Sequence, residues 1–291
     1  MASLSTSGFE NIISMARVVL TGYTGNIGSR LERGLYSSGH EVIKIGRSPG
    51  AHHKFDFLSH ENVLPKVGDI DFVVHTAWYS AYPHYWDAKE NVVFVETSMR
   101  LLEHLFRTSP EKVRFLVAGS CAEIFSVKNP TTGLGAAKAE LRRTLLSCVP
   151  CDRLAWFQIF FAYGAGEPTM KILSLIKSSS NPKMEIKDGG AYRDFISFDQ
   201  VAEIFCGFIN YFKPGVFQVG TGRGYRISDL VDFVEQQKLP TPMNLAEALR
   251  VASDVKIASV EPEVRSLIAD EYETRRALLG WLTDCSSIKA G

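Results

Sequence analysis

The chain has 291 residues, 45% of them hydrophobic, and its 32 basic and 32 acidic side chains give a formal net charge of zero at pH 7. That length can bury a large core, either as one elaborated domain or as a large domain with a small lobe. The balanced charge offers no general electrostatic reason to expect a nucleic acid or an anionic membrane as partner.

The beginning of the chain, its apolar runs and its cysteines argue against a secreted, a membrane-spanning and a disulfide-rich protein. Residues 1–14 lack the basic and then apolar order of a secretory signal, and no apolar run approaches the ~20 residues that span a bilayer. We therefore expect residues 1–15 to be a loose extension and the protein to be cytoplasmic. Five scattered cysteines do not resemble a disulfide framework. Cys148 and Cys151 form C-x-x-C, but no second pair stands at zinc-ligand spacing, so no metal site is predicted.

Residues 18–28, with the sequence VVLTGYTGNIG, are the most informative stretch. An apolar, β-branched run leads to a turn with a glycine at every third position, and apolar residues at helical spacing follow. Gly22 permits a tight turn, Gly25 lets the backbone approach a pyrophosphate, and Gly28 lets the helix pack closely on the strand. This pattern predicts a dinucleotide site, although an ordinary strand-to-helix turn has the same local signature.

A second predicted strand, residues 41–45, bears on the choice of cofactor. Arg47 lies just past its end, nineteen residues after Gly28. An acidic residue there would bond the 2′-hydroxyl of NAD, whereas an arginine suits the 2′-phosphate of NADP. We therefore expect NADP, with NAD as the other possibility; the alternative for Arg47 is a solvated loop residue. Asp56 is placed to meet the adenine amino group.

The rest of the chain alternates strand and helix. Further strands are predicted at 70–76, 113–118, 154–161, 183–187 and 216–219, and helices at 91–108, 134–147, 170–177 and 229–237. Such alternation predicts a parallel sheet covered on both faces, with ligands beyond the carboxyl ends of its strands. Ser228 is expected to cap the helix at 229–237, and a helical, charged pattern continues from residue 240. The aromatic loop at 78–86 indicates either a wall against a ligand or a surface for a partner.

Several motifs, taken in order, resemble the extended short-chain dehydrogenase/reductase family in its nucleotide-sugar epimerase/dehydratase branch. The resemblance is carried by residues 21–28, His75-Thr76-Ala77, Glu90-Asn91-Val92, Gly119-Ser120, Tyr163-Gly164, Arg193-Asp194-Phe195-Ile196, Gly220-Thr221-Gly222 and Leu279-Gly280-Trp281. It implies an α/β fold, a Rossmann-type doubly wound parallel sheet with a small C-terminal substrate-binding lobe. Residues 16–163 would be mainly the dinucleotide-binding core and 164–291 mainly the lobe, with segments around 192–220 returning to the core. A homodimer through the helices at 91–108 and 134–147 is also implied.

The resemblance implies the binding residues as well. For the cofactor they are Gly22, Tyr23, Thr24, Gly25, Asn26, Ile27, Gly28, Arg47, Asp56, Phe57, His75, Ala77 and Lys138. For a nucleotide-diphosphate sugar as substrate they are Tyr79, Asn91, Ser120 and Arg193. Arg193 would clamp the diphosphate, because a planar guanidinium suits bidentate contact with phosphate. The alternative for Arg193 is a salt bridge to Asp194 or Asp199.

The catalytic positions depart from the family pattern. Members normally carry a Tyr-x-x-x-Lys pair, in which the lysine holds the nicotinamide ribose and lowers the pKa of the tyrosine that exchanges a proton. Lys138 matches the lysine, but Leu134 stands at the tyrosine position. Cys121 takes the hydroxyl position on the preceding strand end, and Glu123 falls where dehydratases of the family carry a base. A lysine nearby would lower the pKa of the Cys121 thiol.

Three hypotheses follow from this departure. In the first, another group transfers the proton, and the candidates are Cys121, Glu123, Tyr79, Tyr82 and Tyr85. In the second, Glu123 and Cys121 make the protein an epimerase or dehydratase with a bound cofactor. In the third, the protein is a non-catalytic NADP-binding or regulatory protein. We favour the first: an NADP(H)-dependent oxidoreductase, most simply a keto-sugar reductase, with Lys138, Cys121 and Glu123 as catalytic residues.

Overall fold

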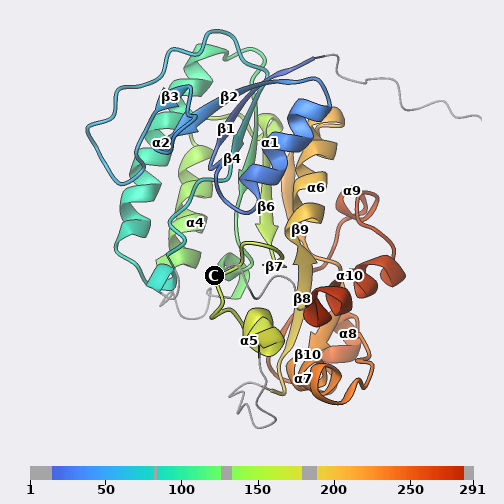
Figure 1. Cartoon of the computed structure of the whole chain (residues 1–291). Coiled ribbons are helices and arrows are strands. Elements are labelled where there is room, and N and C mark those ends of the chain that lie inside the picture. Colours follow the sequence, from blue (N-terminus) through green and yellow to red (C-terminus); the bar gives the residue numbers. More distant parts are fainter. Residues whose placement is uncertain (1–14, 82–83, 126–132, 179–188, 285–291) are drawn as a thin grey trace, which may run out of the picture.

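A computed structural model of the chain describes residues 15–81, 84–125, 133–178 and 189–284. Its centre is a seven-stranded parallel sheet (Figure 1) in the order β3, β2, β1, β4, β5, β6, β9. The strands are β1 (Arg17–Thr21), β2 (Glu41–Gly46), β3 (His53–Lys54), β4 (Phe72–His75), β5 (Arg114–Ala118), β6 (Leu154–Ile159) and β9 (Gly215–Val219).

Helices cover both faces of this sheet (Figure 1). α1 (Gly28–Ser37) and α6 (Phe198–Asn210) pack together on one face, and α2 (Glu90–Thr108) and α4 (Gly133–Leu145) pack together on the other. Val18 and Leu20 join the apolar cluster under α1 and α6, whereas Val19 joins the cluster under α2 and α4. Both faces of β1 are thus buried, which explains its continuous apolar sequence. The prediction of a doubly wound parallel sheet is confirmed.

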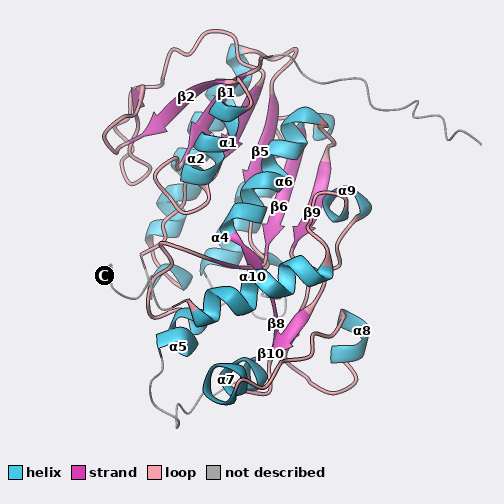
Figure 2. Cartoon of the chain, turned by 45° about the vertical axis from the view of Figure 1, so that its right-hand side comes forward, coloured by secondary structure: helices cyan, strands magenta, loops and turns pink. Residues whose placement is uncertain are grey.

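A smaller lobe follows the carboxyl ends of the strands (Figures 1 and 2). In it β8 (Tyr192–Ser197) pairs with β7 (Phe161–Tyr163), β10 (Gly224–Arg226) and β11 (Val255–Lys256). The helices of the lobe are α5 (Ile172–Ser178), α7 (Ile227–Gln236), α8 (Leu245–Ala248), α9 (Pro262–Arg265) and α10 (Glu271–Thr283). One apolar cluster joins α5, α7 and α10 to β8. A short helix, α3 (Ala122–Phe125), follows β5, and 3₁₀ turns form at His84–Trp86 and Cys151–Arg153.

The strand expected at 154–161 is divided between the two sheets. β6 ends at Ile159, the Phe160 N–H donates to Val219 O at 2.9 Å, and β7 then pairs with β8. The chain therefore passes from the main sheet into the lobe at Phe160. Residues 192–220 divide in the same way, since β8 belongs to the smaller sheet whereas α6 and β9 belong to the main core.

Other local predictions differ in detail. β3 was not expected, because two residues show no periodicity. Ser228 does not cap α7, because α7 begins at Ile227 and its N-cap residue is Arg226. The Ser228 N–H donates to Gly189 O at 2.9 Å. After residue 240, α8, β11 and α9 precede α10, so the expected helical pattern is interrupted. The expected strand at 183–187 and most of the expected extension at 1–15 lie outside the described residues.

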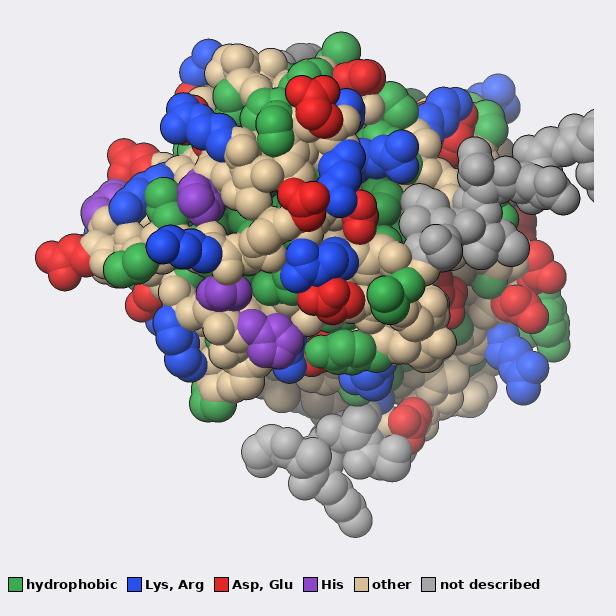
Figure 3. Space-filling view, turned by 90° about the horizontal axis from the view of Figure 1, so that it is seen from above, with side chains coloured by type: hydrophobic (Ala, Val, Ile, Leu, Met, Phe, Trp, Pro, Cys, Tyr) green, Lys and Arg blue, Asp and Glu red, His purple; other side chains and the backbone are tan. Residues whose placement is uncertain are grey.

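The surface carries mixed charge. In Figure 3, which views the molecule from above, Lys and Arg side chains are interspersed with Asp and Glu, in keeping with the net charge of zero. The four described cysteines are free, and the described residues contain no cluster of three or more His, Cys, Asp or Glu able to hold a metal. Across the described ranges, no helix combines the length and apolar character needed to cross a membrane.

Candidate functional site: a dinucleotide cavity at the carboxyl edge of the sheet

The turn between β1 and α1 requires glycine at two positions. Gly22 has φ +72°, and a Cβ there would lie 2.6 Å from the Ala77 nitrogen. A Cβ on Gly28 would lie 2.0 Å from the Gly22 oxygen, so the helix can approach the strand only with glycine at this position. The Gly25 N–H closes the turn by donating to Gly22 O at 2.9 Å. These contacts reproduce the predicted roles of a tight turn and close helix packing.

A cavity of about 740 Å³ opens along this turn and the ends of β2 and β4. Its wall contains these residues predicted for the cofactor: Gly22, Tyr23, Thr24, Gly25, Asn26, Ile27, Gly28, Arg47, Asp56, Phe57 and Ala77. For the described first turn of α1, no side chain forms a cap and no acidic residue is present. The Ser29 and Leu31 N–H groups already donate to Gly25 O and Ile27 O, so a pyrophosphate here would be favoured by the positive end of the helix dipole and by the N–H groups of the loop before α1. The residues present fit a nicotinamide dinucleotide.

The end of the cavity near β2 carries the predicted cofactor-selecting residues. The Arg47 guanidinium is 67% exposed and lies 3.9 Å from the Asp56 carboxylate, a loose ion pair. Asp56 also accepts a hydrogen bond from the Leu58 N–H at 3.0 Å. The Tyr23 hydroxyl donates to Ser48 O at 2.7 Å and fixes the loop that carries Arg47. Arg47 can therefore turn toward a ligand without breaking a strong contact.

His75, predicted to contact the cofactor, lies beneath the cavity rather than in its wall. The ring is fully buried at the end of β4, with Nδ1 2.8 Å from the Thr21 hydroxyl. Nε2 has no hydrogen-bond partner among the described residues. Burial, with a smaller effect from Lys138, lowers the His75 pKa to about 3. The imidazole is neutral at physiological pH and supports the floor of the site.

Lys138 is enclosed under an aromatic ring. Its Nζ donates to Ala118 O at 2.6 Å and lies 3.8 Å from the centre of the Trp78 ring. Burial lowers the pKa of Lys138 to about 7. The Trp78 Nε1–H donates to Asn91 Oδ1 at 2.9 Å, and the Asn91 amide donates to Tyr85 O at 2.9 Å. Trp78 lines the cavity, whereas Lys138 and Asn91, predicted for the cofactor and the substrate, are held behind it.

The Glu123 carboxylate is held by hydrogen bonds and an ion pair from other residues of the protein. Its side chain is 1% exposed and accepts hydrogen bonds from the Ser120 N–H at 2.8 Å and from the Trp156 Nε1–H at 3.0 Å. Gln158 Nε2 lies 3.4 Å away and Arg142 Nε lies 3.5 Å away. With its carboxylate oxygens engaged in this way, Glu123 anchors the turn after β5. Ser120, predicted for the substrate, takes part in this turn, where its Oγ accepts from the Ala122 N–H at 3.2 Å.

The expected activation of Cys121 is wrong in direction. The thiol is buried in a small apolar cluster with Phe160 and Ala258. Burial raises the pKa of Cys121 to about 12, and the cations that act on it are Lys256 and Arg193 rather than Lys138. A thiol with so high a pKa is a poor acid or base near neutral pH.

Arg193 forms an ion pair, but not with the partners considered from the sequence. Its Nη2 lies 2.5 Å from the Asp254 carboxylate, and its guanidinium faces the Phe161 ring at 5.5 Å. The neighbouring Asp194 is fully buried and accepts hydrogen bonds from the N–H groups of Thr221, Gly222 and Ala258. The Arg-Asp motif and the Gly-Thr-Gly motif are thus joined through Asp194. Any diphosphate that reached Arg193 would compete with Asp254.

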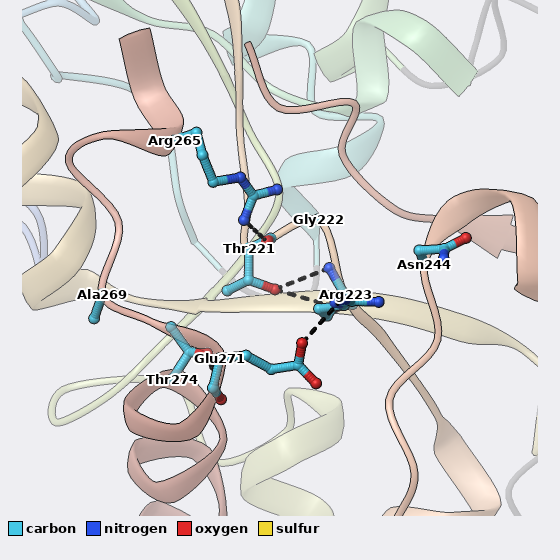
Figure 4. Close-up of a pocket in the computed structure, with 8 residues that line it drawn as sticks. All are labelled: Thr221, Gly222, Arg223, Asn244, Arg265, Ala269, Glu271 and Thr274. Carbon is cyan, nitrogen blue, oxygen red and sulfur yellow. Dashed lines mark hydrogen bonds and ion pairs between the residues drawn. The ribbon is translucent and has the colours of Figure 1, made fainter. Parts of the chain in front are cut away.

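A second hollow, of about 260 Å³, lies where the Gly-Thr-Gly turn meets α10 (Figure 4). Its charged side chains are engaged within the protein. Arg265 donates to Thr221 O at 2.7 Å, and Arg223 pairs with Glu271 at 2.9 Å. The hollow is distant in the chain from the phosphate loop, and its internal pairs hold α10 to the lobe. We assign it no ligand.

Some wall residues were missed from the sequence. Phe94 lines the cavity from α2, Phe198 from the start of α6, and Lys171 from the segment after β7. The aromatic loop had been singled out, and Tyr79 and Tyr85 from it do line the cavity. Lys171 carried no sequence signal, because it lies outside every motif. Tyr82 falls outside the described residues.

Comparisons with known proteins identify the family of the chain and find the same fold in solved structures. The sequence profile of the NAD dependent epimerase/dehydratase family matches residues 18–220. The structure of MoeE5 in complex with UDP-glucose and NAD is 19% identical, with a TM-score of 0.67 over 91% of this chain and 98% of that one. TunA, an NAD dependent NDP-hexosamine 5,6-dehydratase, is 18% identical, with a TM-score of 0.61 over 91% and 97% of the two chains. UDP-N-acetylglucosamine 4-epimerase from Bacillus cereus is 14% identical, with a TM-score of 0.61 over 92% and 98%. The chain therefore belongs to the NAD dependent epimerase/dehydratase family of enzymes, as its motifs predicted.

Proposed function

We propose that the protein is an NADP(H)-dependent oxidoreductase acting on a nucleotide-diphosphate sugar, most simply a keto-sugar reductase. One observation carries this proposal: a single cavity joins the phosphate loop, Arg47 and Tyr79. A bound dihydronicotinamide would supply the hydride, so the protein must supply a proton for the substrate oxygen.

Tyr79 is the proton donor that this geometry favours. It lies half-buried in the cavity wall, beside Phe94, whose ring centre is 6.5 Å away. A phenol is the group that the family normally uses for this step, and Leu134 cannot serve. The described wall does not include Cys121 or Glu123, and the contacts of both are internal. We therefore do not favour the alternative of an epimerase or dehydratase built on these two side chains.

The cofactor and substrate follow from the same cavity. Arg47 supports NADP over NAD, because its guanidinium is exposed and loosely paired at the β2 end. The structures of MoeE5 and TunA, which bear the names of a nucleotide-sugar complex and a nucleotide-sugar dehydratase, support a nucleotide-diphosphate sugar as the substrate class.

A homodimer and a cytoplasmic location remain predictions. α2 and α4 pack against each other and expose several charged pairs, among them Glu103 with Arg107 and Glu140 with Arg143. Both pairs lie within a single helix and say nothing of a partner copy, so the prediction of a homodimer is tested by light scattering, where we expect the mass of two chains.

The test is consumption of NADPH with a panel of 4-keto nucleotide sugars. We expect turnover by the wild type, and a fall in kcat of about a hundredfold in Tyr79→Phe with little change in cofactor affinity. Tyr272→Phe is the matched control, because Tyr272 is 72% exposed on α10. Cofactor binding without consumption across the panel would instead support a non-catalytic NADP-binding protein. Full activity of Tyr79→Phe would remove Tyr79 from the mechanism.

A further inference from the structure

The segment after β7 lies against the phosphate loop. The Asn26 side-chain amide donates to Gly166 O at 3.0 Å, and Arg30 donates to Ala165 O at 3.3 Å. Gly166 has φ +88°, and a Cβ there would lie 2.4 Å from Asn26 Oδ1. Ala165 and Gly166 are therefore fixed against the phosphate loop and the start of α1, and Gly166 and Pro168 form part of the cavity wall.

Lys171 stands at the end of this segment and faces the same cavity. Its Nζ lies 3.6 Å from Glu167 Oε1 and 5.8 Å from the centre of the Phe198 ring. The Lys171 side chain is 30% exposed, whereas that of Glu167 is 4% exposed and also accepts from the Ser174 hydroxyl at 3.1 Å. Burial raises the pKa of Glu167. Lys171 is thus a partly exposed cation, held in the wall by a buried carboxylate.

The other cations of this region have different roles. Among the described wall residues, Arg47 and Lys171 are the two cations. Arg47 lies at the β2 end. Arg30 of α1 is occupied, since it pairs with Asp199 at 2.8 Å and donates to Asn26 O at 2.8 Å. The negative charge of a pyrophosphate at the start of α1 would therefore meet backbone N–H groups on one side and the Lys171 ammonium on the other.

We propose that Lys171 is a pyrophosphate ligand, the cation by which the lobe holds the dinucleotide against the phosphate loop. Its ammonium would donate to a non-bridging phosphate oxygen, a hydrogen bond between two opposite charges, and so would add a full positive charge that neutral backbone amides do not carry. The inference requires that the cavity bind a dinucleotide, as the proposed function does. It requires neither NADP in place of NAD nor any reaction.

The experiment is titration calorimetry with ADP-ribose, which carries the pyrophosphate but no nicotinamide. We expect Lys171→Met to weaken ADP-ribose binding about tenfold, and Lys171→Arg to restore most of it. Adenosine 2′-phosphate, which has no pyrophosphate, should bind Lys171→Met as it binds the wild type. The logarithm of the affinity for ADP-ribose should also depend less on salt concentration in Lys171→Met.

Lys177→Met is the matched control. Lys177 lies on the adjacent helix α5 with its Nζ 3.6 Å from the centre of the Trp281 ring, outside the cavity wall. The double variant Glu167→Gln/Lys171→Met removes the buried unpaired carboxylate that Lys171→Met leaves, and it should show the same loss of affinity. Equal ADP-ribose affinity in Lys171→Met and Lys177→Met would overturn the inference and leave the proposed function intact. Dependence on Lys171 without turnover would refute only the reductase, and no binding of ADP-ribose by the wild type would refute both.

Discussion

Glu123→Gln separates a structural carboxylate from a catalytic one. The carboxylate serves two donors at close range, the Ser120 N–H at 2.8 Å and the Trp156 Nε1–H at 3.0 Å, and both are poorly accessible to water. Both of these donors bond Oε1, which glutamine retains, so the change falls on Oε2: an amide NH₂ group would face the Gln158 Nε2 donor, now at 3.4 Å from Oε2, and the Arg142 guanidinium. A buried donor left without its acceptor costs about 1–3 kcal/mol. The nearby Arg142 would also lose its counter-charge, so we expect the free energy of unfolding to fall by about 2–3 kcal/mol.

Urea denaturation followed by tryptophan fluorescence measures this loss. Glu140→Gln is the control, because Glu140 pairs with Arg143 on the exposed face of α4 and its loss should cost less than about 1 kcal/mol. The reasoning is refuted if Glu123→Gln unfolds at the wild-type urea concentration while its turnover falls steeply. That result would make Glu123 a base in contact with substrate, as the sequence first indicated.

Three further predictions concern cofactor choice and pH. Arg47→Asp should shift the ratio of NADP to NAD affinity at least tenfold toward NAD; an unchanged ratio in fluorescence titrations would exclude Arg47 as the selecting residue. His75 has a pKa of about 3 when folded, below its unfolded value of about 6.5, so stability should fall as pH drops from 6.5 to 4.5, by at most about 1.4 kcal/mol per pH unit. His75→Gln should flatten that slope in urea titrations, and an unchanged slope contradicts the assignment. Lys138 has a folded pKa of about 7, below its unfolded value of about 10.4, so its contribution should increase stability between pH 7 and 9 by about 2 kcal/mol. Lys138→Met should lose that increase, and identical pH profiles would count against the lowered pKa of Lys138.

The phosphate loop could be predicted from the sequence because its constraint is local. Gly22 and Gly28 meet within six residues, and the steric need for glycine does not depend on distant parts of the chain. The alternation of strand and helix is equally local, and it is sufficient for a parallel sheet. Arg47 reaches the cavity for the same reason, since it follows directly from the end of β2.

The contacts of Glu123 and Arg193 could not be predicted from the sequence, because their partners lie far away along the chain. Glu123 meets Trp156 across 33 positions of sequence, and Arg193 meets Asp254 across 61. A carboxylate after a strand end has the same local pattern whether it faces a substrate or a buried indole. Lys171 was missed for the same reason: it lines the cavity of the phosphate loop from a segment remote in sequence, outside every motif.

Lys138 shows why a retained family residue does not by itself establish catalysis. Burying an ammonium costs free energy unless partners compensate it, and here the Ala118 carbonyl and the face of Trp78 offset only part of the cost, since burial still lowers the Lys138 pKa to about 7. A lysine so enclosed links β5, α4 and the aromatic loop through its hydrogen bond and its packing, whether or not a ribose ever reaches it. Leu134, four residues earlier, is buried and apolar, in keeping with a position that packs rather than transfers protons. If the protein reduces a sugar, the proton must then come from a group in the cavity wall, and Tyr79, next to Trp78, is a phenol in that wall.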